Sequence, residues 1–417
     1  MSLLINGVLL EGEKKDILIQ DNRIEKISSN IDKNSDRVIS GQGKVALPSF
    51  FNLHTHAAMT LMRGYSDDLP VQQWLEQKIW PLEEKLTSED VYWGTKLACL
   101  EMIKTGTTFF NDMYWHFEST AQAVEEMGIR ASLGAVFIDL FDEDKAQEQR
   151  LKNAQLYQKI DNYSNRIQFN LGPHSIYTVS AESLEWAREF AEENDLMIHI
   201  HLAESKDEIE QCQDKFGKSP VKYLDEIGFL GSNVIAAHCV WLDEEDIQIL
   251  AENDVKMVHL PASNMKLASG TFPYERLKDR RENIALGTDG SSSNNNLDMF
   301  EEMKIASLLA KIDQMDPTEM PADQIHRMAT KNGAEIFDIK AGIIEEGKLA
   351  DLILVDLNTP EMTPDYNTKS NIVYSANGSC VDTTICNGQV LMESGHVEGE
   401  EKIITKLNQI GNDLITR

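Results

Sequence analysis

Two histidines flank a single threonine in the segment "FFNLHTHAAMTLMRG", where they are His54 and His56. Alternate side chains of a β-strand point to the same face, so this spacing places two imidazoles close enough to share one metal ion. Other apolar runs end at His201 ("HIHLAES") and Asp289 ("LGTDGSSSNN"). Three imidazole nitrogens and one carboxylate oxygen suit zinc with a bound water. We predict that these four residues bind one Zn²⁺ per subunit, with another divalent metal such as Fe²⁺ as the alternative.

Two more side chains are of the types that proton transfer requires. Glu204 follows His201 by three residues, so its carboxylate can move protons between the metal-bound water and a leaving group. His238 ends the run "AAHC", from which it can hydrogen-bond the attacking water or a developing alkoxide. We predict Glu204, His238 and Asp289 as catalytic residues. The alternatives are a helix-capping role for Glu204 and a core role for His238.

The remaining histidines are interpreted mainly as structural. His199 lies two residues before His201 and therefore one layer deeper, where we expect a buried, hydrogen-bonded side chain rather than a ligand. His259, in "HLPASN", either lines the pocket or supports a ligand from behind. The other histidines have no comparable placement; they are His116, His326 and His396.

Substrate contacts are predicted from two segments. His174 follows Gly-Pro in "GPHSIYT", and Glu83 lies in "IWPLEEKL", where an ordinary surface carboxylate is the alternative. Trp74 and Trp80 in the same loop either pack against a flat ring or belong to the local core.

Eight apolar runs alternate with segments of helical period from about residue 46 to residue 345. This alternation predicts repeated βα units around a parallel sheet, and eight strands predict a closed (β/α)8 barrel of the TIM type in the α/β class. The loops at the carboxyl ends of the strands then converge on one face, where the candidate residues above are placed. The predicted strands are "VALPSFFNLH", "TTFFNDMYW", "RASLGAVFID", "IQFNLGPHS", "LMIHIHLAES", "NVIAAHCVWL", "VKMVHL" and "NIALGTDG".

The two ends of the chain have a different pattern, with short β-type runs separated by turns such as Asn-Gly. We predict a small composite β-sandwich domain from residues 1–47 and 346–417, which includes a C-terminal helix over 400–415, and a catalytic barrel over 48–345. Within the barrel, helices are predicted over 88–104 and 180–194, the first with a capping box formed by Thr87 and Asp90.

Composition excludes several classes of partner. The 417 residues carry a net charge of −30, which disfavours binding to nucleic acid and to anionic membrane surfaces. We expect no membrane segment and no secretory signal. The five dispersed cysteines are expected to be buried free thiols, so we predict a cytoplasmic enzyme and, in addition, a homo-oligomer.

Several motifs taken together resemble the amidohydrolase superfamily, and more narrowly its 5-methylthioadenosine/S-adenosylhomocysteine deaminases. They are "HTHAAMTLMRG", "PLEEKL", "GPHS", "HLAES", "AAHC", "LGTDGSSSNNN" and "GKLADLILVD". The absence of lysine from "IQFNLGPHS" favours one metal over a lysine-bridged pair.

The resemblance implies roles for particular residues. It implies one zinc held by the four predicted ligands, Glu204 as the proton shuttle and His238 as the partner of the water. It also implies that Glu83 grips the ribose hydroxyls, that His174 contacts substrate, and that Arg150 matches a second substrate-binding arginine. One departure is that Ala135 stands where the family carries an arginine for an amino-acid carboxylate. An uncharged 5′ substituent is therefore favoured.

The predicted function is hydrolytic deamination of the adenine C6 amine in a small nucleoside: 5′-methylthioadenosine, S-adenosylhomocysteine, 5′-deoxyadenosine or adenosine. The alternatives are an aminohydrolase of another N-heterocycle, such as guanine, a pterin or a triazine, and a non-catalytic binding protein on the same barrel.

Overall fold

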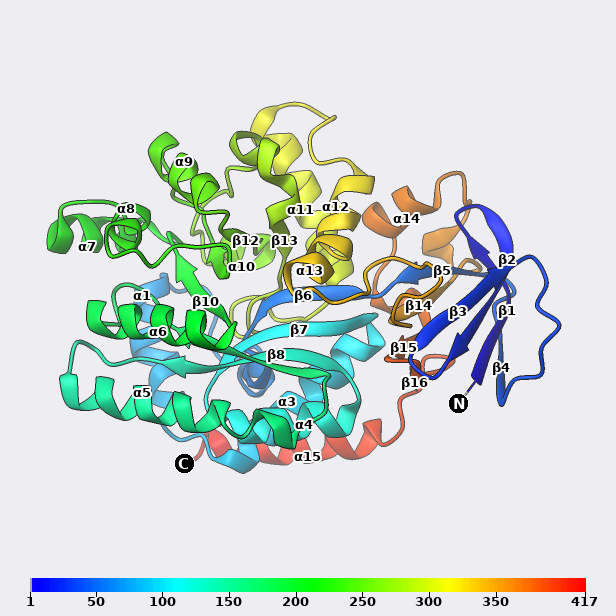
Figure 1. Ribbon diagram of the computed structural model, residues 1–417, viewed down its shortest axis with the longest axis horizontal. Helices are drawn as coiled ribbons and strands as arrows, with labels where there is room; N and C mark the ends of the chain where they lie inside the picture. Colours follow the sequence, from blue (N-terminus) through cyan, green and yellow to red (C-terminus); the bar gives the residue numbers. More distant parts are fainter. Residues whose placement is uncertain (1) are drawn as a thin grey trace.

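Eight parallel strands form the centre of the molecule (Figure 1). The computed structural model describes residues 2–417. The amide of Asp289 donates to the carbonyl oxygen of His54 at 3.0 Å, so the chain leaving the last strand lies against the first. The predicted (β/α)8 barrel is thereby confirmed. Its strands are β6 (Phe50–Thr55), β7 (Thr107–Tyr114), β8 (Arg130–Phe137), β9 (Ile167–Pro173), β10 (Met197–Leu202), β11 (Val234–His238), β12 (Lys256–His259) and β13 (Ile284–Leu286).

The helices cover the outside of this barrel (Figure 1). The predicted helix over 88–104 is α3, whose capping box between Thr87 and Asp90 is present. Ser180 is the N-cap of α6 rather than its first residue. The helices are α1 (Val71–Trp74), α2 (Trp80–Glu83), α3 (Ser88–Lys104), α4 (Phe117–Met127), α5 (Glu143–Tyr157), α6 (Ala181–Asn194), α7 (Lys206–Phe216), α8 (Pro220–Glu226), α9 (Glu244–Glu252), α10 (Pro261–Lys266), α11 (Met299–Gln314), α12 (Ala322–Met328), α13 (Lys331–Ile336), α14 (Thr368–Tyr374) and α15 (Glu400–Leu414).

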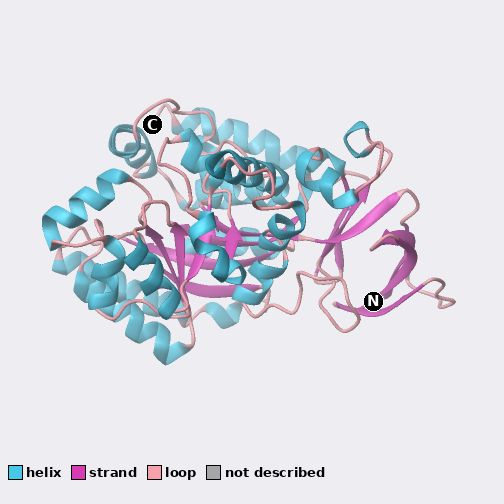
Figure 2. Cartoon of the chain, turned by 90° about the horizontal axis from the view of Figure 1, so that it is seen from above, coloured by secondary structure: helices cyan, strands magenta, loops and turns pink. Residues whose placement is uncertain are grey.

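A second sheet, built from both ends of the chain, lies beside the barrel (Figure 2). Buried side chains from both ends share one core, in which Ile5 and Ile17 pack with Leu352 and Ile385. The strands are β1 (Ser2–Leu10), β2 (Glu13–Gln20), β3 (Arg23–Ser28), β4 (Arg37–Ser40), β5 (Lys44–Pro48), β14 (Leu352–Asp356), β15 (Val381–Cys386) and β16 (Gln389–Met392). We propose the domain boundaries predicted above because β5 ends at Pro48 and β14 begins after residue 346.

One predicted strand is divided between the two sheets. The run "VALPSFFNLH" forms the end of β5 in the terminal sheet and then most of β6 in the barrel. Both parts are apolar because both are buried, so hydropathy alone does not separate them. Pro48, which has no amide hydrogen to donate to a sheet, lies where the chain passes from the terminal sheet to the barrel. The first catalytic strand therefore follows directly from the terminal domain.

The two domains are joined by a buried ion pair. Arg130 at the start of β8 contacts Asp351, just before β14, through Nε and Oδ2 at 2.5 Å, and both side chains are buried. The five cysteines are free and buried, as predicted. Within residues 2–417, the helices lack the length and apolar composition needed to cross a bilayer.

Candidate active site

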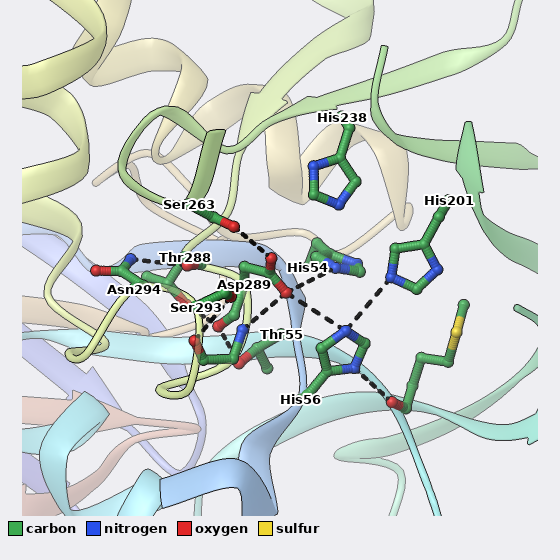
Figure 3. Close-up of polar contacts among 12 residues, drawn as sticks. His54, Thr55, His56, His201, His238, Ser263, Thr288, Asp289, Ser293 and Asn294 are labelled. Carbon is green, nitrogen blue, oxygen red and sulfur yellow. Dashed lines mark hydrogen bonds and ion pairs between the residues drawn. The ribbon is translucent and has the colours of Figure 1, made fainter. Parts of the chain in front are cut away.

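The predicted ligands meet at the carboxyl ends of three barrel strands (Figure 3). His54 lies in β6 with His56 just beyond it, His201 lies in β10, and Asp289 follows β13. The rings of His54 and His56 have centroids 4.9 Å apart, as expected for an H-x-H pair on one face of a strand. Barrel geometry, rather than sequence proximity, brings all four side chains to one centre.

The ligand atoms converge closely. Oδ1 of Asp289 lies 3.3 Å from Nε2 of His54 and 3.3 Å from Nε2 of His56. Nε2 of His201 lies 3.3 Å from Nε2 of His56. Nε2 of His54 is buried and has no hydrogen-bond partner in the described chain. An unpartnered buried nitrogen is costly unless another group satisfies it, and a divalent cation at this centre would do so.

The opposite side of each ligand is held by a neighbouring group. Nδ1 of His56 donates to the carbonyl oxygen of Met113 at 2.7 Å, and Nδ1 of His201 donates to that of His174 at 2.8 Å. A carbonyl oxygen only accepts, so the proton of each neutral ring is on Nδ1 and the lone pair of Nε2 faces the centre. Ser263 similarly donates to Oδ2 of Asp289 at 2.7 Å, and the amide of Gly290 donates to Oδ1 at 2.8 Å, so both carboxylate oxygens are held in place.

Electrostatics favour the metal-binding forms of these side chains. Burial lowers the pKa of His54 to about 4 and holds the pKa of His201 well below its ordinary value. Burial opposes ionisation of Asp289, but the neighbouring histidines, led by His54, hold its pKa well below the ordinary range. Near neutral pH His54 and His201 are therefore neutral imidazoles, and Asp289 is a carboxylate.

Glu204 and His238 face each other beside this centre. Oε2 of Glu204 lies 3.8 Å from Nε2 of His238, whose Nδ1 contacts Oδ1 of Asn264 at 2.9 Å. Burial raises the pKa of Glu204, although His238 opposes the change. For His238, burial lowers the pKa, but the carboxylates of Glu204 and Asp289 outweigh it and raise the pKa above its ordinary value. A carboxyl group and an imidazole with shifts in these directions suit proton transfer near neutral pH.

The turns that follow the strands are strained. Ala203, His238 and Asp289 have φ angles of 52°, 73° and 62°, in the left-handed region that residues other than glycine rarely adopt. Glu208 on α7 accepts the amides of Ala203 at 3.0 Å and Glu204 at 2.8 Å. Its carboxyl group is buried, and burial raises its pKa to about 7. Glu208 thus holds the turn that directs Glu204.

A cavity of ≈ 650 Å³, including the part open to solvent, lies over the ligands. Three of the residues predicted to contact substrate line this cavity: Trp74, Glu83 and His174. Burial raises the pKa of Glu83 to about 7, which Tyr114 and Trp115 offset only in part. The cavity wall thus combines aromatic rings and a carboxyl group beside the predicted ligands.

The structure does not bring Arg150 to this cavity. Its guanidinium contacts Oε1 of Glu143 at 3.0 Å and the carbonyl oxygen of Ala146 at 3.2 Å, both on its own helix α5. Arg150 lies two turns after Glu143, the first residue of α5. Its side chain points back toward the start of this helix instead of toward the cavity.

Of two other histidines, His199 occupies the supporting position expected of it, whereas His259 does not line the cavity. Nε2 of His199 contacts Nδ1 of His54 at 2.7 Å from one layer deeper in the barrel. His259 is buried and stacks on Phe272 with ring centroids 4.6 Å apart, away from the cavity.

Sequence reasoning missed several groups that hold the site: Ser263, Asn264 and Glu208, together with Tyr114 and Trp115 in the cavity wall. The last two had a usable signal, since they end the predicted strand "TTFFNDMYW" at the catalytic face. Ser263 and Asn264 follow β12 in "HLPASN", where only His259 was a candidate, and serine and asparagine after a barrel strand carry no comparable signal.

Comparison with known proteins agrees with this geometry. The profile of the amidohydrolase family matches residues 45–391, and the chain belongs to this family. It is 50% identical over 399 residues to a 5-methylthioadenosine/S-adenosylhomocysteine deaminase of Thermococcus sibiricus, covering 94% of each chain. A 5′-deoxyadenosine deaminase of Methanothermobacter thermautotrophicus is 47% identical, with 97% of each chain covered. A zinc-bound adenosine deaminase from Xanthomonas campestris superimposes with a TM-score of 0.94 at 32% identity, covering 100% of this chain and 99% of that one.

Proposed function

We propose that this protein removes the C6 amine of a 5′-substituted adenosine by hydrolysis, releasing ammonia and the inosine analogue. The candidate substrates are 5′-methylthioadenosine, S-adenosylhomocysteine, 5′-deoxyadenosine and adenosine. The observation that carries the proposal is the convergence of three imidazoles and the Asp289 carboxylate beside Glu204 and His238 in one cavity. The relatives of similar sequence are named as deaminases of such nucleosides.

His54, His56, His201 and Asp289 would hold one zinc ion, because their nitrogens and carboxylate form the ligand set that zinc prefers. When bound, zinc supplies Lewis acidity that lowers the pKa of water toward neutrality. The unpartnered Nε2 of His54 supports this assignment.

The residues around the ligands then carry the proton transfers. The oxygen of the attacking water bonds to C6 while Asp289 accepts one of the protons of that water. His238 donates a hydrogen bond to the same oxygen. Glu204, which burial keeps readily protonated, protonates N1 of the ring and makes C6 more electrophilic. Glu204, now a carboxylate, takes the remaining proton from the oxygen on C6 and delivers it to the exocyclic nitrogen. The C6–N bond then breaks, the C6 carbonyl forms, ammonia leaves, and the proton held by Asp289 returns to Glu204. Each step needs only groups that line the cavity.

Substrate orientation is assigned to three other wall residues. Glu83 would accept hydrogen bonds from the ribose hydroxyls, and His174 and Trp74 would contact the remainder of the nucleoside. A ribose-binding carboxylate favours nucleosides over bare bases such as guanine, which remain the alternative substrates.

Metal analysis combined with ammonia release from a panel of nucleosides and bases tests the proposal. We expect one zinc per chain and turnover of 5′-substituted adenosines. Turnover of guanine, a pterin or a triazine alone would contradict it. Glu204→Gln with metal retained should lose about 100-fold or more in kcat, because it removes the proton shuttle; turnover close to that of the unchanged protein would refute the role of Glu204.

The cytoplasmic location and homo-oligomeric state expected from the sequence remain part of the proposal. Light scattering of the purified protein tests the second, and a monomer would contradict it.

A further inference from the structure

One wall of the catalytic cavity is formed by residues 71–86, here called the substrate segment. Trp74, Trp80 and Glu83 of this segment line the cavity. Its helical elements are short: α1, a π-helical turn over Leu75–Ile79, and α2. Helical turns of four or five residues are not stable in water without packing partners. The position of Glu83 in the cavity therefore depends on the groups that hold this segment.

An apolar cluster joins the substrate segment to helix α15, which packs along α3 (Figure 1). Leu414, the last residue of α15, is 0% exposed and belongs to this cluster. The other buried members are Ala58, Met59, Met62, Trp74, Ile79, Leu82, Leu86, Val91 and Tyr114. Because several of these members, Trp74 among them, also line the cavity, the burial of Leu414 supports the cavity wall from outside.

Arg417 holds the end of the substrate segment through polar contacts. Its Nη1 and Nη2 donate to Oδ2 and Oδ1 of Asp90 at 2.5 and 3.0 Å, and Nη1 also donates to the carbonyl oxygen of Lys85 at 3.2 Å. Asp90 is buried and belongs to the capping box at the start of α3. Burial opposes its ionisation, but hydrogen bonds led by that of Arg417 lower its pKa. A bidentate arginine–carboxylate pair has a fixed geometry, so Lys85, two residues after Glu83, is held at a set position beside α3.

We propose that Leu414 and Arg417 latch the substrate segment and thereby position Glu83 and Trp74 for the nucleoside. This inference rests on the proposed function for the identity of the substrate. Neither Leu414 nor Arg417 lines the cavity, so both are positioning residues. Without the latch, a smaller fraction of the molecules holds the binding-competent wall, and KM rises by that factor. The proton-transfer groups lie on other elements, so kcat is retained.

Hydrogen exchange of the purified protein, measured without substrate, tests the latch directly. In Arg417→Met, peptides from residues 71–86 should exchange about tenfold faster, the value of one charge-assisted hydrogen bond. Leu414→Ala removes buried apolar contacts and should have at least the same effect. Arg417→Lys, which keeps a charge at Asp90, should retain part of the protection. With 5′-methylthioadenosine, KM should rise at least about threefold in Arg417→Met and Leu414→Ala, and kcat should change less than about twofold.

Two matched controls lie on the same helix. Lys406→Met breaks a surface ion pair with Glu89 at 3.0 Å, which also joins α15 to α3. Ile403→Ala removes a buried side chain of α15 that packs in the barrel core instead of in the cluster of Leu414. We expect both controls to leave KM unchanged, and Lys406→Met to leave exchange of the substrate segment unchanged as well.

Unchanged exchange of the substrate segment in both Arg417→Met and Leu414→Ala would overturn the inference. Faster exchange with an unchanged KM would overturn it too, because the segment would then not position substrate. Exchange needs no substrate, so it reports on the latch even if the protein releases ammonia from no nucleoside. In that case the proposed function fails, and the exchange result alone decides whether the latch exists.

Discussion

Replacement of Glu208 by glutamine is expected to slow turnover without removing the metal. The carboxylate is 2% exposed and accepts the amides of Ala203 and Glu204 at 3.0 and 2.8 Å. Glutamine keeps one acceptor but turns its NH₂ toward the second amide, which costs about 1.5–3 kcal/mol. Ala203, at φ 52°, is strained and will relax once this support weakens. A displacement of Glu204 by about 1 Å then lowers kcat about 100-fold.

The assay is steady-state ammonia release at about pH 8, above the pKa of about 7 that burial gives Glu208. We expect kcat to fall while KM and zinc content change less than about threefold, since Glu208 contacts neither substrate nor ligands. Glu210→Gln is the control, because Glu210 lies on the same helix in an exposed pair with Lys206. If Glu208→Gln keeps kcat within about threefold, or if KM and metal content carry the whole loss, the positioning role is refuted.

Three further results are expected. Because the raised pKa of about 7 leaves Glu83 protonated at lower pH, kcat/KM should fall as the pH drops below about 7, and Glu83→Gln should abolish this limb of the profile. Asn264→Ala removes the partner of His238 at 2.9 Å and should lower kcat about tenfold in steady-state assays. Arg130→Met leaves the buried carboxylate of Asp351 without its counter-ion, which should reduce the free energy of unfolding by about 3–5 kcal/mol in denaturant titrations without changing kcat.

Each of these results has a clear opposite. An acid limb that survives in Glu83→Gln would assign it to another group. Unchanged kcat in Asn264→Ala would mean that other contacts suffice to orient His238. A loss of kcat in folded Arg130→Met would show that the domain contact reaches the active site.

The barrel and its ligand set were predictable because both follow from local patterns. Each strand needs an apolar run, and each ligand stands at the end of such a run, so His54, His56, His201 and Asp289 were identifiable one by one. Thr87 and Asp90 similarly mark the start of α3. Capping motifs and hydropathy patterns involve residues that are only a few positions apart. Such short-range patterns can be recognised in a single sequence.

The residues that orient the catalytic groups were not predictable in this way. Left-handed turns at Ala203 and His238 involve no glycine, so the sequence carries no signal for them. Glu208 resembles any other acidic residue of an exposed helix until the turn that it supports is known. Arg150 resembles any other arginine of an exposed helix, and only the packing of α5 determines that its guanidinium contacts Glu143 instead of the cavity.

The terminal sheet also constrains the order in which the protein can be completed during synthesis. Strand β5 pairs on one side with β1 and on the other with β14, which the ribosome makes roughly 300 residues later. At about 5–20 residues per second, one edge of β5 stays unpaired for on the order of 15–60 s. Such an unpaired edge can form hydrogen bonds with other nascent chains. The terminal domain is therefore the first to begin synthesis and the last to have its strand edges paired and so shielded from aggregation.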